Sequence, residues 1–169
     1  MATIAERGVR IRPIGADGYE RFLAIAAVAL LVTVIAALAR GYPHWSAVPG
    51  TVWAHLATIM LALALTPAML LRRRGDTRHR LLGKIWVAAM FLTAAITLFV
   101  RQSHPGHFSI IHLISLYVLI AAPLIWWTAH TRRVTAHRRQ VRGMVTGALL
   151  VAGFFTLPFG RMLGGWLFG

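Results

Sequence analysis

Long apolar runs separated by short basic segments form the main pattern of the chain. Each run is long enough for a helix that crosses a bilayer, because a helix rises about 1.5 Å per residue and the hydrocarbon core is about 30 Å thick. The pattern therefore predicts an all-α transmembrane protein with five membrane-spanning helices. These helices are expected over residues 22–39, 51–71, 85–100, 108–129 and 144–163.

The basic residues sort sharply between the segments that connect these runs. Of 18 Lys and Arg, only three are expected on the side that the first and third connections share: Arg40, Arg101 and Arg161. The rest lie in the N-terminal segment and in the second and fourth connections. This asymmetry predicts a multi-pass protein of the bacterial inner membrane, with its N-terminus in the cytoplasm and its C-terminus outside. The net charge of +14 is then explained by orientation and by contact with anionic lipids, and not by nucleic-acid binding.

The first run is expected to be a membrane anchor, although Ala37-Leu38-Ala39 at its end resembles a signal-peptidase site. Its apolar stretch is longer than the 7–15 residues usual for a signal peptide. The predicted organisation is a cytoplasmic tail over 1–20, the first helix and an outer loop over 21–50, and a helical bundle over 51–169.

The bundle has the pattern of a tandem duplication, with repeats over 51–107 and 108–169. Four landmarks recur in the same order at a nearly constant shift. They are His55 and His112, Pro67 and Pro123, His79-Arg80 and His137-Arg138, and the Thr-Leu segments that lead to Arg101 and Arg161. Both hairpins start on the same side, so the repeats are parallel and related by an axis along the membrane normal. The expected product is a four-helix bundle with the first helix packed outside it.

Two histidines near the outer ends of equivalent helices point to a cofactor. Depth counting places His55 and His112 in one layer with Arg101 and Arg161. Two neutral imidazoles on facing helices are the ligand set of a b-type haem, and two arginines can neutralise its propionates. The leading hypothesis is a bis-histidine haem protein in membrane electron transfer, with a quinone among its partners.

Several alternatives remain for the same residues. The two histidines can hydrogen-bond between helices and only hold the bundle together, or they can line a pocket for a quinone or a lipid headgroup. A bound transition metal would recruit His104 and His107 from the third connection. The alternative function is a non-redox membrane scaffold or an anionic-lipid-binding protein that holds no cofactor.

The repeated pair on the cytoplasmic side suggests an anion site. His79-Arg80 and His137-Arg138 are both expected just before a helix start, where backbone N–H groups and the helix dipole favour phosphate. Phosphates of anionic lipids are the expected ligands. A second haem between His79 and His137 is a further alternative, which the arginine-rich setting of both histidines disfavours.

Some chemistry is missing from the sequence. The absence of cysteine excludes disulfides, thiolate metal sites and iron–sulfur clusters. None of the four acids is expected inside a span, which removes carboxylate proton relays and most ion-coupled transport. No hydrolase or phosphate-loop pattern is present. Four tryptophans are expected at the membrane interfaces: Trp45, Trp53, Trp126 and Trp127.

The region over 51–165 resembles a known group of bacterial membrane proteins. The resemblance lies in "RLLGKIW" after a Thr-x-His-Arg turn, in "HFSIIHLISL", and in "AHRRQVRGMVTGALLVAGFFTLPFGRMLG", with Gly83 among the matching positions. The chain is similar here to the predicted membrane proteins grouped as domain of unknown function 2306 (DUF2306). The resemblance implies a small multi-helix inner-membrane protein and implies no reaction.

Overall fold

The computed structural model describes residues 15–99, 110–158 and 160–169, and this part of the chain is helical and contains no strand. Four of its helices are long and apolar enough to cross a bilayer, which makes the chain compatible with a multi-pass membrane protein. In the fourth helix the candidate span is His112–His130. The four helices are α1 (Gly18–Arg40), α2 (Gly50–Leu71), α3 (Thr77–Thr97) and α4 (Ile110–His130).

The C-terminal part is more broken than expected. A continuous helical stretch is formed by α5 (Val134–Gly143), the π-helix η2 (Met144–Val151) and α6 (Ala152–Phe154). A short helix, α7 (Met162–Phe168), follows after a break, and a 3-10 helix, η1 (Tyr42–Ala47), lies between α1 and α2. The expected helix over 144–163 therefore starts earlier and ends at Phe154, because Pro158 has no backbone N–H to donate and disfavours helix before it. The fifth membrane crossing stays a prediction.

Two helix starts differ from expectation, and in both cases an aspartate explains the difference. Asp17 accepts a hydrogen bond from the Glu20 N–H at 3.0 Å while the Glu20 carboxylate accepts one from the Asp17 N–H, so a capping box starts α1 at Gly18. Asp76 caps α3 through the His79 N–H in the same way. Glu20 therefore lies in the first turn of α1, ahead of the apolar run over 22–39, which contains no acid.

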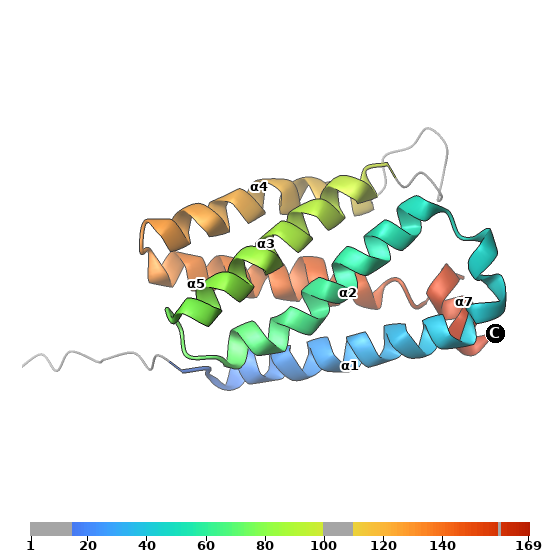
Figure 1. Ribbon diagram of the computed structural model, residues 1–169, viewed down its shortest axis with the longest axis horizontal. Coiled ribbons are helices and arrows are strands. Elements are labelled where there is room, and N and C mark those ends of the chain that lie inside the picture. Colours follow the sequence, from blue (N-terminus) through green and yellow to red (C-terminus); the bar gives the residue numbers. More distant parts are fainter. Residues whose placement is uncertain (1–14, 100–109, 159) are drawn as a thin grey trace, which may run out of the picture.

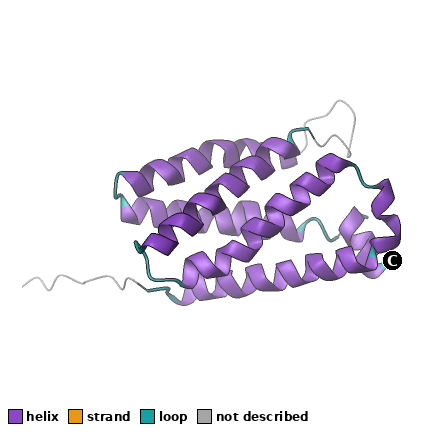
Figure 2. Cartoon of the chain, in the orientation of Figure 1, coloured by secondary structure: helices purple, strands orange, loops and turns teal. Residues whose placement is uncertain are grey.

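The long helices run antiparallel to their neighbours and pack as one bundle (Figure 1). Helix α2 packs against α1 and α3, while α3 also packs against α4. Helix α1 packs in addition against η2 and α7, and it shares the core with the other helices through residues such as Leu23, Ala27 and Val34. Among the described connections, those from α2 to α3 and from α4 to α5 are short turns at one end of the bundle, and the one from α1 to α2 contains η1 at the other end (Figure 2).

The bundle has two chemically different ends. At the end where α1 and α3 begin and α2 and α4 finish, on the left of Figure 1, lie the arginine-rich turns after Leu71 and His130. We call it the basic end. The starts of α2 and α4 lie at the other end together with α7, which we call the opposite end. Between them, within the apolar core, the fully buried Trp86 donates its indole N–H to Thr66 at 2.9 Å and so joins α3 to α2.

Candidate functional sites

A buried carboxylate organises the basic end. The side chain of Glu20 is only 3% exposed and pairs with three arginines, which come from the α2–α3 turn and from α5. Arg138 approaches with two nitrogens, Nε to Oε1 at 2.8 Å and Nη2 to Oε2 at 3.1 Å. Arg74 bonds the same carboxylate, and Arg142 lies 3.2 Å from Oε1. A buried charge needs such pairing to be tolerated, and the two-pronged contact of Arg138 is the strongest form of it.

Asp17 completes this group, which we call the Glu20 cluster (Asp17, Glu20, Arg74, Arg138 and Arg142). Its Oδ2 accepts hydrogen bonds from Arg138, at 2.8 Å, and from Arg142. Desolvation alone would raise the pKa of Asp17, but the Glu20 backbone N–H and the two guanidinium groups outweigh it and hold the pKa below its usual value. The cluster therefore joins the start of α1 to the α2–α3 turn and to α5.

A small pocket lies beside the Glu20 cluster and brings two predicted site residues together. Its volume is about 40 Å³, which is room for water-sized molecules. His79 from α3 and His137 from α5 both line it, together with Arg138, which shows that three of the four residues of the repeated basic motif meet at one place. The other lining residues are Glu20, Met69, Leu70, Arg74, Val134 and Val141.

The histidines of this pocket are largely shielded from water. His137 Nδ1 lies 3.2 Å from the Ile125 carbonyl, and because a carbonyl only accepts, Nδ1 carries the proton and Nε2 keeps its lone pair. Burial lowers the pKa of His137, the bond to Ile125 partly opposes this, and His79 and Arg74 nearby lower it further. His79 Nδ1 is buried and has no hydrogen-bond partner among the described residues.

The predicted anion site therefore has a different local setting from the one expected. His79 and Arg80 lie in the first turn of α3, and His137 and Arg138 lie within α5, so neither pair precedes a helix start. Arg138 is engaged by Glu20 and Asp17, whereas Arg80 does not line the pocket. The anion that Arg138 binds in this structure is a carboxylate of the chain itself.

His55 lies in the second turn of α2 and is fixed by threonines of α3. Its Nδ1 lies 3.0 Å from the Thr97 hydroxyl, which donates its own proton to the Thr93 carbonyl at 2.7 Å. The Thr97 oxygen therefore accepts from His55, so Nδ1 carries the ring proton and the lone pair is on Nε2. A nearby hydrogen bond between the hydroxyls of Thr58 and Thr93, at 2.6 Å, adds to this polar contact between α2 and α3.

The structure places two of the other three residues expected in one layer with His55, namely His112 and Arg161. His112 opens the candidate span of α4 and is half-buried, at the same end of the bundle as the start of α2. Arg161 is the N-cap residue of α7 and is exposed. Arg101 lies outside the described residues, as do His104 and His107. Within the described ranges, no three His, Asp or Glu side chains are grouped so that they could hold a metal ion.

The basic end also carries cations and aromatic rings on its outer surface. Lys84 lies over the Trp126 ring at 5.6 Å, and Arg133 lies over the Trp127 ring at 4.7 Å. Both tryptophans are about half exposed, which suits the amphipathic boundary between lipid and water. Further basic residues in the helices and turns of this end are exposed, among them Arg21, Arg73, Arg78, Arg132 and Arg139.

The Glu20 cluster is not among the sites predicted from the sequence, although one sequence pattern pointed to the position of Glu20. Asp17-x-x-Glu20 directly before an apolar run is a capping-box pattern and marks a helix start. It would have placed Glu20 inside the first helix, where a carboxylate requires a partner. Nothing in the sequence indicates that this partner is Arg138, which is 118 residues away.

Comparison with known proteins adds no relative. No family model matches the chain, no curated protein matches it, and no solved structure matches it. Membership of the DUF2306 group thus stays a prediction from the motifs.

Proposed function

We propose that the protein is a multi-pass protein of the bacterial inner membrane that binds haem b through His55 and His112 and serves in membrane electron transfer. The observation that carries this proposal is the orientation of His55. Its Nδ1–H is held by Thr97, which leaves the lone pair of Nε2 available to ligate a metal inside an apolar helix. Metal-ligating histidines characteristically have their second ring nitrogen fixed in this way.

The placement of the two histidines is consistent with one shared ligand. His55 and His112 lie near the starts of α2 and α4, and both helices pack against α3. Two neutral imidazoles suit ferric and ferrous haem, and the group would supply reversible one-electron chemistry there. The arginines proposed for its propionates are Arg161, on α7 at the same end, and Arg101.

The role of the protein chain would be to hold and shield this group. Thr97 fixes the ring of His55, and the apolar faces of α2 and α4 exclude water. A quinol in the membrane is the proposed electron donor, and an acceptor on the outer side would receive the electron. A single haem near one face exchanges electrons efficiently with that side only.

The deciding experiment is an absorption spectrum of the purified protein from haem-replete cells, first air-oxidised and then reduced with dithionite. We expect a Soret band that sharpens on reduction, with α and β bands, and loss of all three in His55→Ala and in His112→Ala. His130→Ala, an exposed histidine at the end of α4, is the matched control and should keep the spectrum. A featureless spectrum at good yield of folded protein would refute the proposal.

A second function, an anionic-lipid-binding scaffold without cofactor, is favoured by the exposed cations of the basic end. Residues such as Arg78, Arg132 and Arg139 are exposed, and each adds about 1 kcal/mol of attraction to an anionic surface. This function predicts that Arg78→Gln combined with Arg139→Gln lowers the amount of co-purifying phosphatidylglycerol. Replacing His55 would then leave lipid binding and the spectrum unchanged.

A further inference from the structure

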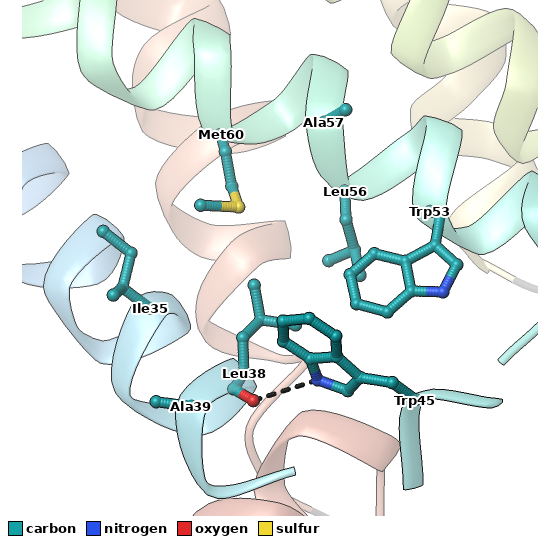
Figure 3. Close-up of a pocket in the computed structure, with 8 residues that line it drawn as sticks. All are labelled: Ile35, Leu38, Ala39, Trp45, Trp53, Leu56, Ala57 and Met60. Atoms are coloured by element: carbon teal, nitrogen blue, oxygen red, sulfur yellow. Dashed lines mark hydrogen bonds between the residues drawn. The ribbon is translucent and has the colours of Figure 1, made fainter. Parts of the chain in front are cut away.

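An apolar cavity that is open to the surface lies between α1 and α2 at the opposite end of the bundle. Its volume is about 420 Å³, within the range of about 300–1,000 Å³ that is usual for ligand pockets. Figure 3 shows its lining side chains, which come from the end of α1, from η1 and from the first half of α2. They are Ile35, Leu38, Ala39, Trp45, Trp53, Leu56, Ala57 and Met60.

The lining offers a ligand almost no polar partner. The indole N–H of Trp45 donates to the Leu38 carbonyl at 3.1 Å, which satisfies both groups (Figure 3). The ring of Trp53 meets that of Trp45 edge to face at 5.0 Å, and its nitrogen points away from the other labelled side chains. A quinone head or a sugar would lose hydrogen bonds to water here and regain none, whereas a hydrocarbon chain loses nothing.

The surface that leads to the cavity is apolar as well. On α1, Val28, Val32 and Ile35 follow each other at helical spacing and are 45%, 59% and 48% exposed. Both α1 and α2 are candidate membrane spans, so the medium that these exposed side chains require is lipid. The cavity is therefore continuous with a surface that the acyl chains of a bilayer would cover.

The last residue of α1, Arg40, is a cation at the end of this apolar surface. Arg40 directly follows Ala39 of the cavity lining and is exposed at the last turn of α1. One of its guanidinium nitrogens donates to the Leu167 carbonyl, and a guanidinium has five N–H donors, so others are left for a phosphate. Arg40 is therefore at the same depth as the water-side end of the cavity, and an apolar cavity with a cation at that depth suits the polarity of a phospholipid.

We propose that this cavity is a binding site for one membrane phospholipid, whose acyl chain fills the space between α1 and α2 and whose phosphate lies against Arg40. The site is independent of any haem. Trp45 and Trp53 pack on the chain, and Ala57 leaves the room that the chain occupies. The small side chains at positions 39 and 57 are what keep this cavity open.

The test is to count retained phospholipids by native mass spectrometry of the whole chain after extensive detergent exchange. The wild type should retain about one phospholipid, and Ala57→Phe, which fills the cavity, should lose it. The matched control is Ala54→Phe, one turn earlier on α2 and not in the lining, which should retain the lipid. Arg40→Gln should retain both phosphatidylglycerol and phosphatidylcholine less well than the wild type, because both carry the phosphate that Arg40 is proposed to contact.

A second measurement keeps the proposal falsifiable if lipid is lost in detergent. In nanodiscs made with acyl-brominated phosphatidylglycerol, bromine in the cavity should quench Trp53, so wild-type emission should be quenched more than that of Trp53→Phe. The excess should vanish in Ala57→Phe. Equal quenching in the wild type and Ala57→Phe, or a quinone retained in place of phospholipid, would overturn the proposal.

Discussion

At the scale of single residues, a buried carboxylate must be paired, and Glu20 meets this requirement through three arginines. The side chain of Glu20 is 3% exposed, whereas those of the arginines are 21–26% exposed. Substitution of Glu20 should therefore cost more stability than substitution of any one of the arginines. Removing one partner of a buried ion pair leaves the other charges uncompensated.

Glu20→Gln should therefore lower the free energy of unfolding by about 3 kcal/mol, near the lower limit for a buried pair because the arginines can still reach water. Thermal unfolding in a mild detergent measures this change. Asp17→Asn is the control: Asn still caps the helix, the side chain of Asp17 is 44% exposed, and the loss should stay below about 1 kcal/mol. Equal effects of both substitutions would contradict the central place of Glu20.

Thr97 is expected to act through His55. Thr97→Val removes the acceptor for Nδ1–H, so haem affinity should fall by about 10- to 100-fold and the reduction midpoint should rise, since the ligand becomes less basic. Haem titration and a spectroelectrochemical midpoint measure the two changes. Thr97→Ser restores the hydroxyl and should restore both values, whereas a role of Thr97 in packing alone would leave the midpoint unmoved.

His137 should make stability depend on pH. Its pKa is lowered by burial below the ordinary value of 6.5, so the unfolded chain binds a proton more readily than the folded protein. The contribution is fully present above about pH 6.5 and is lost as the pH falls toward the lowered pKa. The unfolding temperature should drop between about pH 7 and pH 5, and His137→Gln should flatten this slope. An identical slope in the variant would show that other groups titrate.

At the scale of elements, α7 is held at the end of α1 by close packing around two glycines, Gly41 at the C-cap of α1 and Gly164 within α7. A Cβ on Gly41 would collide with the ring of Trp166, and one on Gly164 would collide with the Leu157 carbonyl oxygen. The contact between Arg40 and the Leu167 carbonyl joins the same two elements. Glycine at positions 41 and 164 is thus required for α7 to cover this end of the bundle.

Gly164→Ala should displace α7, because the obstacle is backbone and cannot rotate away, at a cost of about 1–3 kcal/mol. Limited chymotrypsin digestion should then cut within α7 faster than in the wild type. At the adjacent Gly165 an added Cβ would meet nothing within 4 Å, so Gly165→Ala serves as the control and should leave the rate of cleavage unchanged. Faster cleavage in both variants would point to a general loosening of the helix.

Four of the expected elements were predictable because apolar runs of membrane length dictate helices whatever their partners are. The exact ends of the helices were not predictable, since they depend on single residues. Asp17 and Asp76 cap α1 and α3 at earlier positions than expected, and Pro158 ends the last long helix early. At the site, the repeated His-Arg motif predicted that His79 and His137 have similar positions, and both line one pocket, from α3 and α5. The pairing of Arg138 with Glu20 depends on how α1 packs against the C-terminal helical stretch, which a single sequence does not reveal.

At the scale of the whole molecule, the two ends differ in charge, and this difference predicts the orientation in the membrane. The chain has no cysteine, so single introduced cysteines report on each side without background. Ser46→Cys in η1 should react with a membrane-impermeant maleimide in intact cells, whereas Thr131→Cys should react only after permeabilisation; both positions are exposed. Labelling of Thr131→Cys in intact cells would reverse the orientation.

The same approach tests the fifth crossing. If the predicted crossing over 144–163 exists, Gly169→Cys at the C-terminus should be labelled in intact cells, like Ser46→Cys. Protection of Gly169→Cys until permeabilisation would leave only four crossings and would place α7 on the cytoplasmic side. Because α7 packs against the end of α1 near η1, the first outcome is the one expected from the structure.

The pairing of Glu20 has a consequence for how the chain is made. Glu20 leaves the ribosome early, but its partner Arg138 follows 118 residues later, and translation at about 5–20 residues per second puts about 6 to 24 s between them. Arg74, which follows Glu20 by 54 residues, is the only arginine of the cluster to be synthesised during this interval. The nascent first helix therefore carries an incompletely neutralised acid until α5 arrives, which makes completion of the chain, and not insertion of α1, the step that locks the bundle. Truncated products would expose this acid as a mark that membrane quality control can recognise.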